Sequence, residues 1–477
     1  MKKPISCLLG MLCCMATMAQ EAWDLRRCVD HALANNISVK QQDVQARIAD
    51  VNYVQSKRSQ YPSLNLQSNL GYNFGRSINI ATNQFTEVSF FSNNISLQTD
   101  VDVFNFFSKR NGIASYRLDA LAAGALADKV RNDVALNVAL NYLQVLQARQ
   151  QVQILRIKQA QTKAQLGVTR KQVDAGALPE LNAAQLEAQL AQDSANVVNA
   201  KTSEIQALYS LKALLALDAA VPFDVVVPPV SVIPLEPVDS LRPDLVYATA
   251  LQNMPQQRYN SLRLAAADKA VASARGSMYP RLTFGAGITT RYSGAQQQAD
   301  FLGDSTKFVV PVGYVQNTGA PVLREVAQPN FSAPYTSPYF TQFNNNMGRF
   351  VGFTITVPIV NGGQARAGWE RAKLTRATAA LQQQGDSLTL KQDIYKAYAD
   401  AMNALERFNA AGKAVEANQK AFEYAGKRYN IGLLTTLELL NAQSGLFQAQ
   451  LQRASAQFEY VFRMKLLEFY KGRGLKL

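Results

Sequence analysis

The chain has 477 residues, 48% of them hydrophobic, which is enough for a large folded protein of two or three domains. The formal net charge is +14, but its Lys and Arg residues are scattered, so a nucleic-acid partner is not expected. One histidine and four cysteines provide no metal-ligand set, and the sequence has no nucleophile elbow or phosphate-binding glycine loop, so neither an enzyme nor a bound cofactor is expected.

Residues 1–19 have the pattern of a secretory signal peptide. Two lysines precede an apolar run, and the run ends in small residues at Ala19. Removal of this segment would leave Cys28 as the one cysteine, expected to be a small buried hydrophobe. Beyond it no run of 18 apolar residues occurs, so a helical membrane span is not expected, whereas the weaker alternating signal of a membrane strand is present.

Residues 20–217 are predicted to form a first structural repeat that begins with a helix and a β-hairpin. The helix ends before Tyr61-Pro62, because proline disfavours helical backbone both at its own position and at the preceding residue. The hairpin covers residues 63–104, where apolar and polar residues alternate in two runs.

Two helices complete this repeat. The first, over residues 106–173 with Asn105 as its N-cap, would span on the order of 100 Å, far more than an ordinary globular helix. It carries an uncharged amide stripe suited to face water inside a tube of helices. The alternative interpretation is an ordinary coiled-coil exterior, which usually carries more Lys and Glu. The stripe consists of Asn137, Asn141, Gln144, Gln147 and Gln151. The second helix covers residues 180–217.

A proline-rich linker over residues 218–243 separates this repeat from a second one over residues 244–477. Tyr279-Pro280 matches Tyr61-Pro62, and Asn361 matches Asn105. These matches occur in the same order in both halves of the chain, which indicates an internal twofold repeat. The predicted elements are a helix from about Leu245 to Ser277, a β-hairpin over 281–360 that contains a long loop at 293–348, a long helix over 362–429 and a helix over 437–470.

The turn around Gly432 carries the most specific local signals. Gly432 suits the left-handed conformation that ends a helix, where a Cβ is penalised. Thr435 and Glu438 have the spacing of a capping box, so the last helix is expected to begin there. A similar turn is predicted around Gly176, followed by Pro179 in the first helical turn.

The hairpins are expected to form a membrane barrel only together with other copies. Four strands cannot close a barrel, open sheet edges are not tolerated in lipid, and single-chain barrels begin at eight strands. Three chains would supply twelve strands. The predicted fold is mainly α with membrane β, a trimeric twelve-stranded barrel continuous with an α-helical coiled-coil barrel. The alternative is a soluble periplasmic coiled-coil scaffold or adaptor, which explains the helices but not the alternating strands behind a signal peptide.

The alternation also predicts which strand residues meet lipid. The apolar set expected to face lipid includes Leu66, Leu97, Phe284 and Ile355. The polar set expected to face a water-filled lumen includes Asn65, Gln98, Thr283 and Thr356.

Over essentially its whole mature length the chain resembles the TolC family of outer-membrane efflux proteins. The resemblance is carried by Trp-Asp-Leu-Arg-Arg-Cys-Val-Asp-His-Ala-Leu at residues 23–33, by the duplicated strand and helix plan, and most specifically by residues 429–440. It implies a homotrimer in contact with the lipid of the outer membrane of a Gram-negative bacterium, with a helical tunnel extending into the periplasm. It also implies an exit duct for efflux or type I secretion that docks a periplasmic membrane-fusion adaptor and an inner-membrane transporter.

The resemblance further implies roles for residues at the turns. The tip and adaptor-docking residues would be Gly176, Tyr429, Gly432, Leu433, Leu434 and Thr435. The family narrows its tip with acidic rings at two positions that match Glu438 and Asn441 here, so these are the implied gate residues and one of the two charges is absent. Leu434 stands where a basic residue is often found. None of these features identifies the cargo or the transporter.

Overall fold

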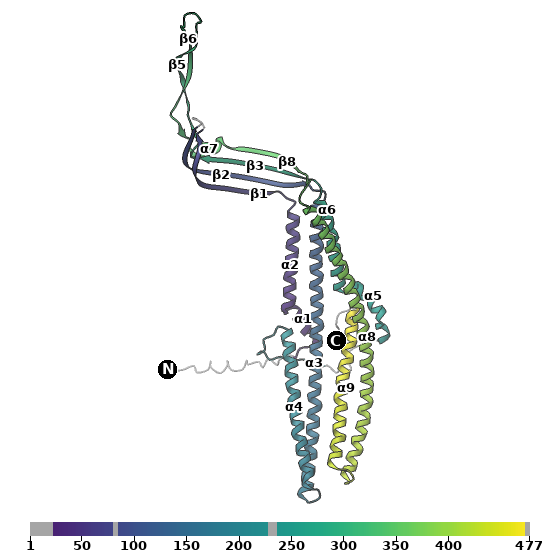
Figure 1. The fold of residues 1–477 in the computed structure, drawn as a ribbon. Coiled ribbons are helices and arrows are strands. Elements are labelled where there is room, and N and C mark those ends of the chain that lie inside the picture. The colour runs from purple at the N-terminus through teal and green to yellow at the C-terminus, as the bar shows by residue number, and fades with distance from the viewer. Residues whose placement is uncertain (1–21, 80–83, 228–235, 473–477) are drawn as a thin grey trace, which may run out of the picture. The chain divides into compact units, whose positions relative to one another are not determined.

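The computed structural model describes residues 22–79, 84–227 and 236–472 (Figure 1). The chain divides into two compact units, each of which takes segments from both halves of the sequence. The helical unit consists of Met1–Tyr53, Ala114–Lys269 and Ala372–Leu477, and the strand unit of Val54–Ile113 and Ala270–Arg371. The predicted signal peptide, residues 1–19, lies outside the described residues.

The helices include four long ones that begin and end within three residues of their predicted bounds. These are α3 (Ser108–Asp174), α4 (Glu180–Leu214), α8 (Gln364–Asn430) and α9 (Thr436–Tyr470). In Figure 1, α3 lies beside α4 and α8 beside α9. The shorter helices are α1 (Leu25–Asn35), α2 (Ile37–Arg58), η2 (Val238–Leu241), α5 (Pro243–Asn253) and α6 (Pro255–Gly276).

Two helices that were predicted to be continuous are broken, so the prediction of a single helix was wrong in both places. Asn36 separates α1 from α2, because its side chain accepts a hydrogen bond from Ser38 N at 2.9 Å and caps the second helix. Pro255 separates α5 from α6, since proline has no N–H for α5 and disfavours helical backbone at Met254.

Helix α3 begins at Ser108 rather than at the predicted residue 106. Phe106 and Phe107 have positive φ values of 48° and 62°, so the backbone turns before the helix starts. Gly276 lies against this turn: a Cβ there would be 2.9 Å from the Phe106 carbonyl oxygen. Glycine is therefore required at the end of α6 for the two segments to approach this closely.

One face of the short helix α1 packs into the core of the helical unit. Leu25, Cys28 and Ala32 follow one another at helical spacing, so they share this face, and all three are buried. They belong to the same core cluster as Tyr142 of α3. Burial raises the pKa of the Cys28 thiol to about 12, so the thiol stays protonated and unreactive, and the prediction of a small buried hydrophobe is confirmed.

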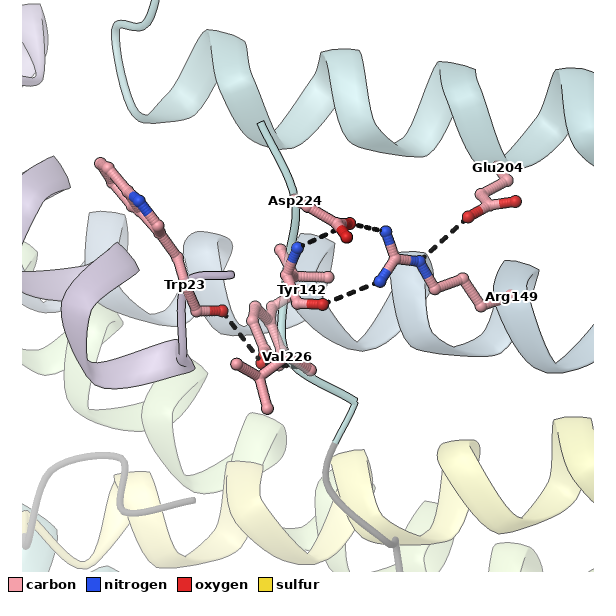
Figure 2. A network of polar contacts seen from close by, with 7 residues as sticks. Trp23, Tyr142, Arg149, Glu204, Asp224 and Val226 are labelled. Carbon is pink, nitrogen blue, oxygen red and sulfur yellow. Dashed lines mark hydrogen bonds and ion pairs between the residues drawn. The ribbon is translucent and has the colours of Figure 1, made fainter. Parts of the chain in front are cut away.

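The proline-rich segment is tied to this core by the polar network in Figure 2. Val225 forms a parallel bridge with Trp23, and the Tyr142 hydroxyl donates to the Val226 carbonyl at 2.6 Å. Arg149 donates to Glu204 Oε1 at 2.9 Å and to the Val225 carbonyl at 2.8 Å, and it also pairs with Asp224. These contacts provide hydrogen-bond partners for the backbone of an extended segment that does not belong to a sheet.

The strand unit contains one four-stranded antiparallel sheet in the order β1-β2-β3-β8. Its strands are β1 (Ser63–Asn79), β2 (Gln84–Phe104), β3 (Arg281–Ser293) and β8 (Gly348–Thr356). The two predicted hairpins thus join through pairing of β2 with β3, in a register that sets Leu97 opposite both Leu66 and Ile288.

The prediction of a loop over residues 293–348 was wrong. The segment contains β4 (Gln297–Gln298), β5 (Phe301–Tyr314), β6 (Pro321–Phe331), β7 (Tyr335–Thr336) and helix α7 (Tyr339–Asn345). Its prolines indicated a loop, yet β5 and β6 form a two-stranded ribbon in which both strands are edges. Proline is tolerated on edge strands, at strand starts and at bulges, and Pro321 starts β6.

Candidate functional site: the turns between the long helices and the face of the sheet

The turn between α8 and α9 ends α8 in a Schellman motif. Gly432 has a φ of +76°, its N–H donates to the Tyr429 carbonyl at 3.0 Å, and Leu433 N–H donates to the Arg428 carbonyl at 2.9 Å. A Cβ on Gly432 would meet no atom within 4 Å, so the requirement for glycine comes from the backbone conformation and not from crowding.

Helix α9 then starts with the predicted capping box, which is confirmed. Thr435 Oγ1 accepts from Glu438 N at 3.3 Å, and Glu438 Oε2 accepts from Thr435 N at 2.9 Å and from Thr435 Oγ1 at 2.7 Å. The hydrogen bonds from the Thr435 backbone and hydroxyl lower the pKa of the exposed Glu438 carboxyl, so it is ionised at neutral pH.

The turn between α3 and α4 ends its helix in the same way. Gly176 has a φ of +74° and donates to the Val173 carbonyl at 2.8 Å, and Ala177 N–H donates to the Gln172 carbonyl at 2.8 Å. Pro179 precedes α4 and supplies no side-chain cap, so this turn has no counterpart of the Thr435–Glu438 pair.

A contact between the two turns was missed at the level of sequence. The Tyr429 hydroxyl lies 3.3 Å from Thr169 Oγ1 of α3 and 3.3 Å from Thr436 Oγ1 of α9, and both threonines are buried. Tyr429 was identified as a tip residue, but Thr169 is 260 positions away and no local pattern predicts it. The hydroxyl joins the end of α8 to α3, so it couples the two helical hairpins.

The other predicted tip and gate residues differ in exposure. Leu433 is exposed and Leu434 is half-buried, while Glu438 and Asn441 are both exposed on the first turns of α9. Ile431 and Leu437, like Leu433, are large apolar residues that are exposed at this turn.

A buried polar cluster holds α3 to α4, and sequence reasoning missed it as well. Asp193 is 1% exposed and accepts from Lys158 Nζ at 3.1 Å, from Thr162 Oγ1 at 2.8 Å and from Gln189 Nε2 at 2.8 Å. The carboxylate is thus fully hydrogen-bonded, which a buried charge requires. This cluster fixes the register of the hairpin that presents Gly176.

The amide stripe of α3 is partly used within the chain. Asn137, Gln144 and Gln151 are exposed, whereas Gln147 donates to Ser455 Oγ of α9 at 3.0 Å. Part of the stripe is therefore available to water, and part of it joins helices.

In the sheet, the register places the four predicted lipid-facing residues on one face. Leu66 lies opposite Leu97, Leu97 opposite Ile288, and Phe284, four residues from Ile288, lies opposite Phe353. Ile355 is two residues from Phe353, so it shares that face. Leu66, Phe353 and Ile355 are exposed, which gives the chain an uncovered apolar sheet face.

Asn65, Gln98, Thr283 and Thr356 lie on the opposite face by the same register. Within residues 22–79, 84–227 and 236–472, no group of three or more His, Cys, Asp or Glu side chains is arranged to hold a metal ion. Over the same ranges, no helix combines the length and apolarity needed to span a membrane.

Comparison with known sequences gives matches over most of the chain. The sequence model described as "Outer membrane efflux protein" matches residues 28–217 and 246–463. The chain is 25% identical over 407 residues to the pyoverdine export outer membrane protein OpmQ of Pseudomonas aeruginosa, covering 83% of this chain and 72% of OpmQ. It is 22% identical over 448 residues to the outer membrane efflux protein BepC of Brucella suis, covering 93% of this chain and 84% of BepC.

Solved structures share the fold at low sequence identity. CusC superposes with a TM-score of 0.76 at 17% identity, covering 94% of this chain and 92% of CusC. The outer membrane protein VceC of Vibrio cholerae superposes with a TM-score of 0.73 at 16% identity, covering 95% of this chain and 97% of VceC. The combination of long helices with a small sheet is therefore common to these proteins.

Proposed function

Because the chain belongs to the outer membrane efflux protein family and is an efflux channel of the outer membrane of a Gram-negative bacterium, we propose that it acts as a homotrimer. Twelve pooled strands form a membrane barrel, and the long helices form a tunnel in the periplasm. The turns dock a periplasmic adaptor and an inner-membrane transporter, and cargo passes without chemical change. The soluble scaffold is the weaker alternative, since the relatives are outer membrane proteins of efflux or export.

The main support for the proposed trimer is that the sheet has two open edges. Among the described strands, β1 pairs only with β2, and β8 pairs only with β3. Each edge presents unpaired N–H and C=O groups, which lipid does not tolerate. Pairing β1 of one copy with β8 of the next satisfies both edges, and three copies exceed the eight strands of the smallest single-chain barrels.

Two exposed apolar helix stripes support the same arrangement. Leu374, Leu381 and Leu388 of α8 repeat every seven residues and are exposed, and on α2 exposed Val44 and Val51 have the same spacing. Such stripes are typical of helices that pack against a partner helix. Helix α2 directly precedes edge strand β1, and helix α8 follows edge strand β8. Each unpaired strand edge is therefore next in the chain to a helix with an exposed apolar stripe.

In the proposed barrel, one face of the sheet points to lipid and the other to the lumen. In this proposal Leu66, Leu97, Phe284 and Ile355 meet outer-membrane lipid, and the opposite polar face lines the lumen. The exposed apolar side chains on the first face support this assignment, because transfer of apolar surface out of water stabilises the inserted state by about 25 cal/mol per Å².

We propose that the adaptor docks at the turns, and substitution of Gly432 tests this proposal. We expect Gly432→Val to insert as a trimer but to lose capture of the adaptor through a photoreactive residue at Leu433. A non-glycine residue in the left-handed conformation costs roughly 1–2 kcal/mol, and a β-branched one fits worst, so the turn would change shape. Gly432→Asn is the control, since asparagine tolerates a positive φ. Unchanged adaptor capture by Gly432→Val would show that the turn is not the docking surface.

The proposed gate is formed by Glu438 and Asn441 on the first turns of α9. Three copies around the channel axis would bring three Glu438 carboxylates together, where they repel one another and attract a passing cation. Asn441 contributes no charge, so the gate would depend on one acidic ring rather than two. The capping role and the gating role of Glu438 differ in a testable way.

Glu438→Gln keeps the capping geometry and removes the charge. We expect it to weaken block by multivalent cations added on the periplasmic side in planar bilayers, with only a small loss of thermal stability at neutral pH, because the glutamine amide oxygen can still accept the two hydrogen bonds from Thr435. Because hydrogen bonding lowers the folded-state pKa of Glu438, the contribution of the carboxylate is present at neutral pH and is lost as the pH falls through that pKa. Identical block in both proteins would leave Glu438 as a cap alone.

A further inference from the structure

The aromatic ring of Phe350 lies along the sheet, across two glycines of the neighbouring strand. Phe350 of β8 pairs with Gly287 of β3, and Gly285 is two residues from Gly287, so the three positions share one face. A Cβ on Gly287 would be 2.9 Å from Cζ of the ring and closer still to Cε1, and a Cβ on Gly285 would be 3.9 Å from Cε2. The far edge of the ring therefore occupies the space that a side chain at residue 287 would need.

The ring belongs to the polar face of the sheet. Gly287 also pairs with Gln98 of β2, and Gln98 pairs with Asn65 of β1, so these residues form one row with Phe350. In the proposed channel this row lines the lumen. Phe350 is the largest side chain of the row, and it is 50% exposed, so one side of the ring is open to the lumen. Side chains on strands commonly stand perpendicular to the sheet, and a phenylalanine that did so here would narrow the channel.

The contact that holds the ring down lies within one chain. Strands β3 and β8 are neighbours in the same sheet, and the unpaired edge of β8 is on the side of Phe350 away from Gly287. Pairing of that edge with another copy therefore leaves the place of the ring over β3 unoccupied by other side chains. A glycine inside a strand marks a close approach of another group, and an aromatic cross-strand neighbour that covers it stabilises the pair.

We infer that Gly287 and Gly285 hold the Phe350 ring against the channel wall and thereby set the width of the lumen at this level. The inference rests on the proposed function, because it requires the polar face to line a channel. All copies have the same register, so threefold symmetry brings three Phe350 rings to one level. A side chain at residue 287 would displace the ring, and since the sheet lies beneath it, the ring would move into the lumen. The size of solute that passes would then fall.

The test is the largest thiol reagent, in a series of increasing size added outside intact cells, that labels Thr356→Cys. Thr356 is the last residue of β8 on the lumen face and lies between Phe350 and α8 in the chain, so a reagent from outside must pass Phe350 to reach it. Native Cys28 is buried and should not react. Adding Gly287→Ala should abolish labelling by the largest reagents and keep labelling by the smallest, whereas Phe350→Ala should admit larger ones.

Gly352→Ala is the matched control. Gly352 lies on the same face of β8, and a Cβ there would meet no atom within 4 Å, so the size limit should equal that of the parent. Gly287→Ala combined with Phe350→Ala should recover at least the parent limit, because no ring is left to displace. A Cβ on Gly287 would also be 3.1 Å from the Leu97 carbonyl oxygen. If distortion of the sheet at that contact caused the effect, the double variant would stay impaired, and the inference would be overturned.

An unchanged size limit in both Gly287→Ala and Phe350→Ala would overturn the inference as well. A failure of the proposed function gives a different result. If the two faces of the sheet were exchanged, reagents would label Ile355→Cys and none would label Thr356→Cys in any variant. Labelling of Thr356→Cys with a size limit that ignores residues 287 and 350 would leave the channel intact and reject only the role of the ring.

Discussion

Leu66→Arg should strongly reduce the amount of this protein in the outer membrane, whereas Asn65→Arg should assemble normally and alter conductance. The two residues are neighbours on β1 and lie on opposite faces of the sheet. An arginine facing lipid costs about 2–4 kcal/mol near the midplane, and a trimer would carry three of them. A lumen arginine stays in water, so it changes ion selectivity more than stability. The measurement is quantification of trimer in outer-membrane fractions, together with single-channel recording.

Leu97→Arg extends this test to the neighbouring strand. Leu97 lies opposite Leu66 in the register, so it should behave like Leu66, while Gln98→Arg should behave like Asn65. If the Asn65 and Gln98 variants disappear from the membrane and the Leu66 and Leu97 variants accumulate, the assignment of the two faces is inverted.

Asp193→Ala should destabilise the helical unit by about 3–5 kcal/mol, the usual cost of removing one partner from a buried ion pair. Asp193 is 1% exposed, and its loss would leave Lys158 and Thr162 without their acceptor between α3 and α4. The measurement is thermal or denaturant-induced unfolding of the purified protein. Asp193→Leu combined with Lys158→Met should recover much of the loss, because no buried charge is then left unpaired.

Asp133→Ala is the matched control, since Asp133 pairs with Lys129 on the surface of the same helix α3. Exposed pairs of this kind contribute about 0–1 kcal/mol. An equal loss of stability in Asp133→Ala and Asp193→Ala would mean that the buried pair is not a principal contact between α3 and α4.

The sequence predicted those elements whose signals are local. The capping box of Thr435 and Glu438 follows from a three-residue spacing, and the end of α8 shortly before Gly432 follows from one glycine. The strand faces follow from a period of two, so Leu66 and Leu97 could be assigned to one face before their pairing was known. The periods of long helices and strands are repeated many times, which makes them easy to recognise.

Features that depend on distant contacts or on a single backbone position were not predicted. Asn36 breaks a helical pattern at one residue only, where its side chain also donates to the Leu214 carbonyl. The β5–β6 ribbon lies in a segment whose prolines predict a loop, although edge strands tolerate proline. Tyr429 with Thr169, and Lys158 with Asp193, join separate helices, and nothing in either local sequence specifies the partner.

The proposed trimeric channel is tested most directly by one experiment on the purified mature protein. In mild detergent its native mass should equal that of three chains, and the same preparation should give discrete conductance steps in planar bilayers. The open edges of β1 and β8 are the reason for this expectation, because neither edge has a pairing strand in the described part of the chain and pairing between copies would supply one. A soluble monomer recovered from the periplasmic fraction, with no conductance, would contradict it.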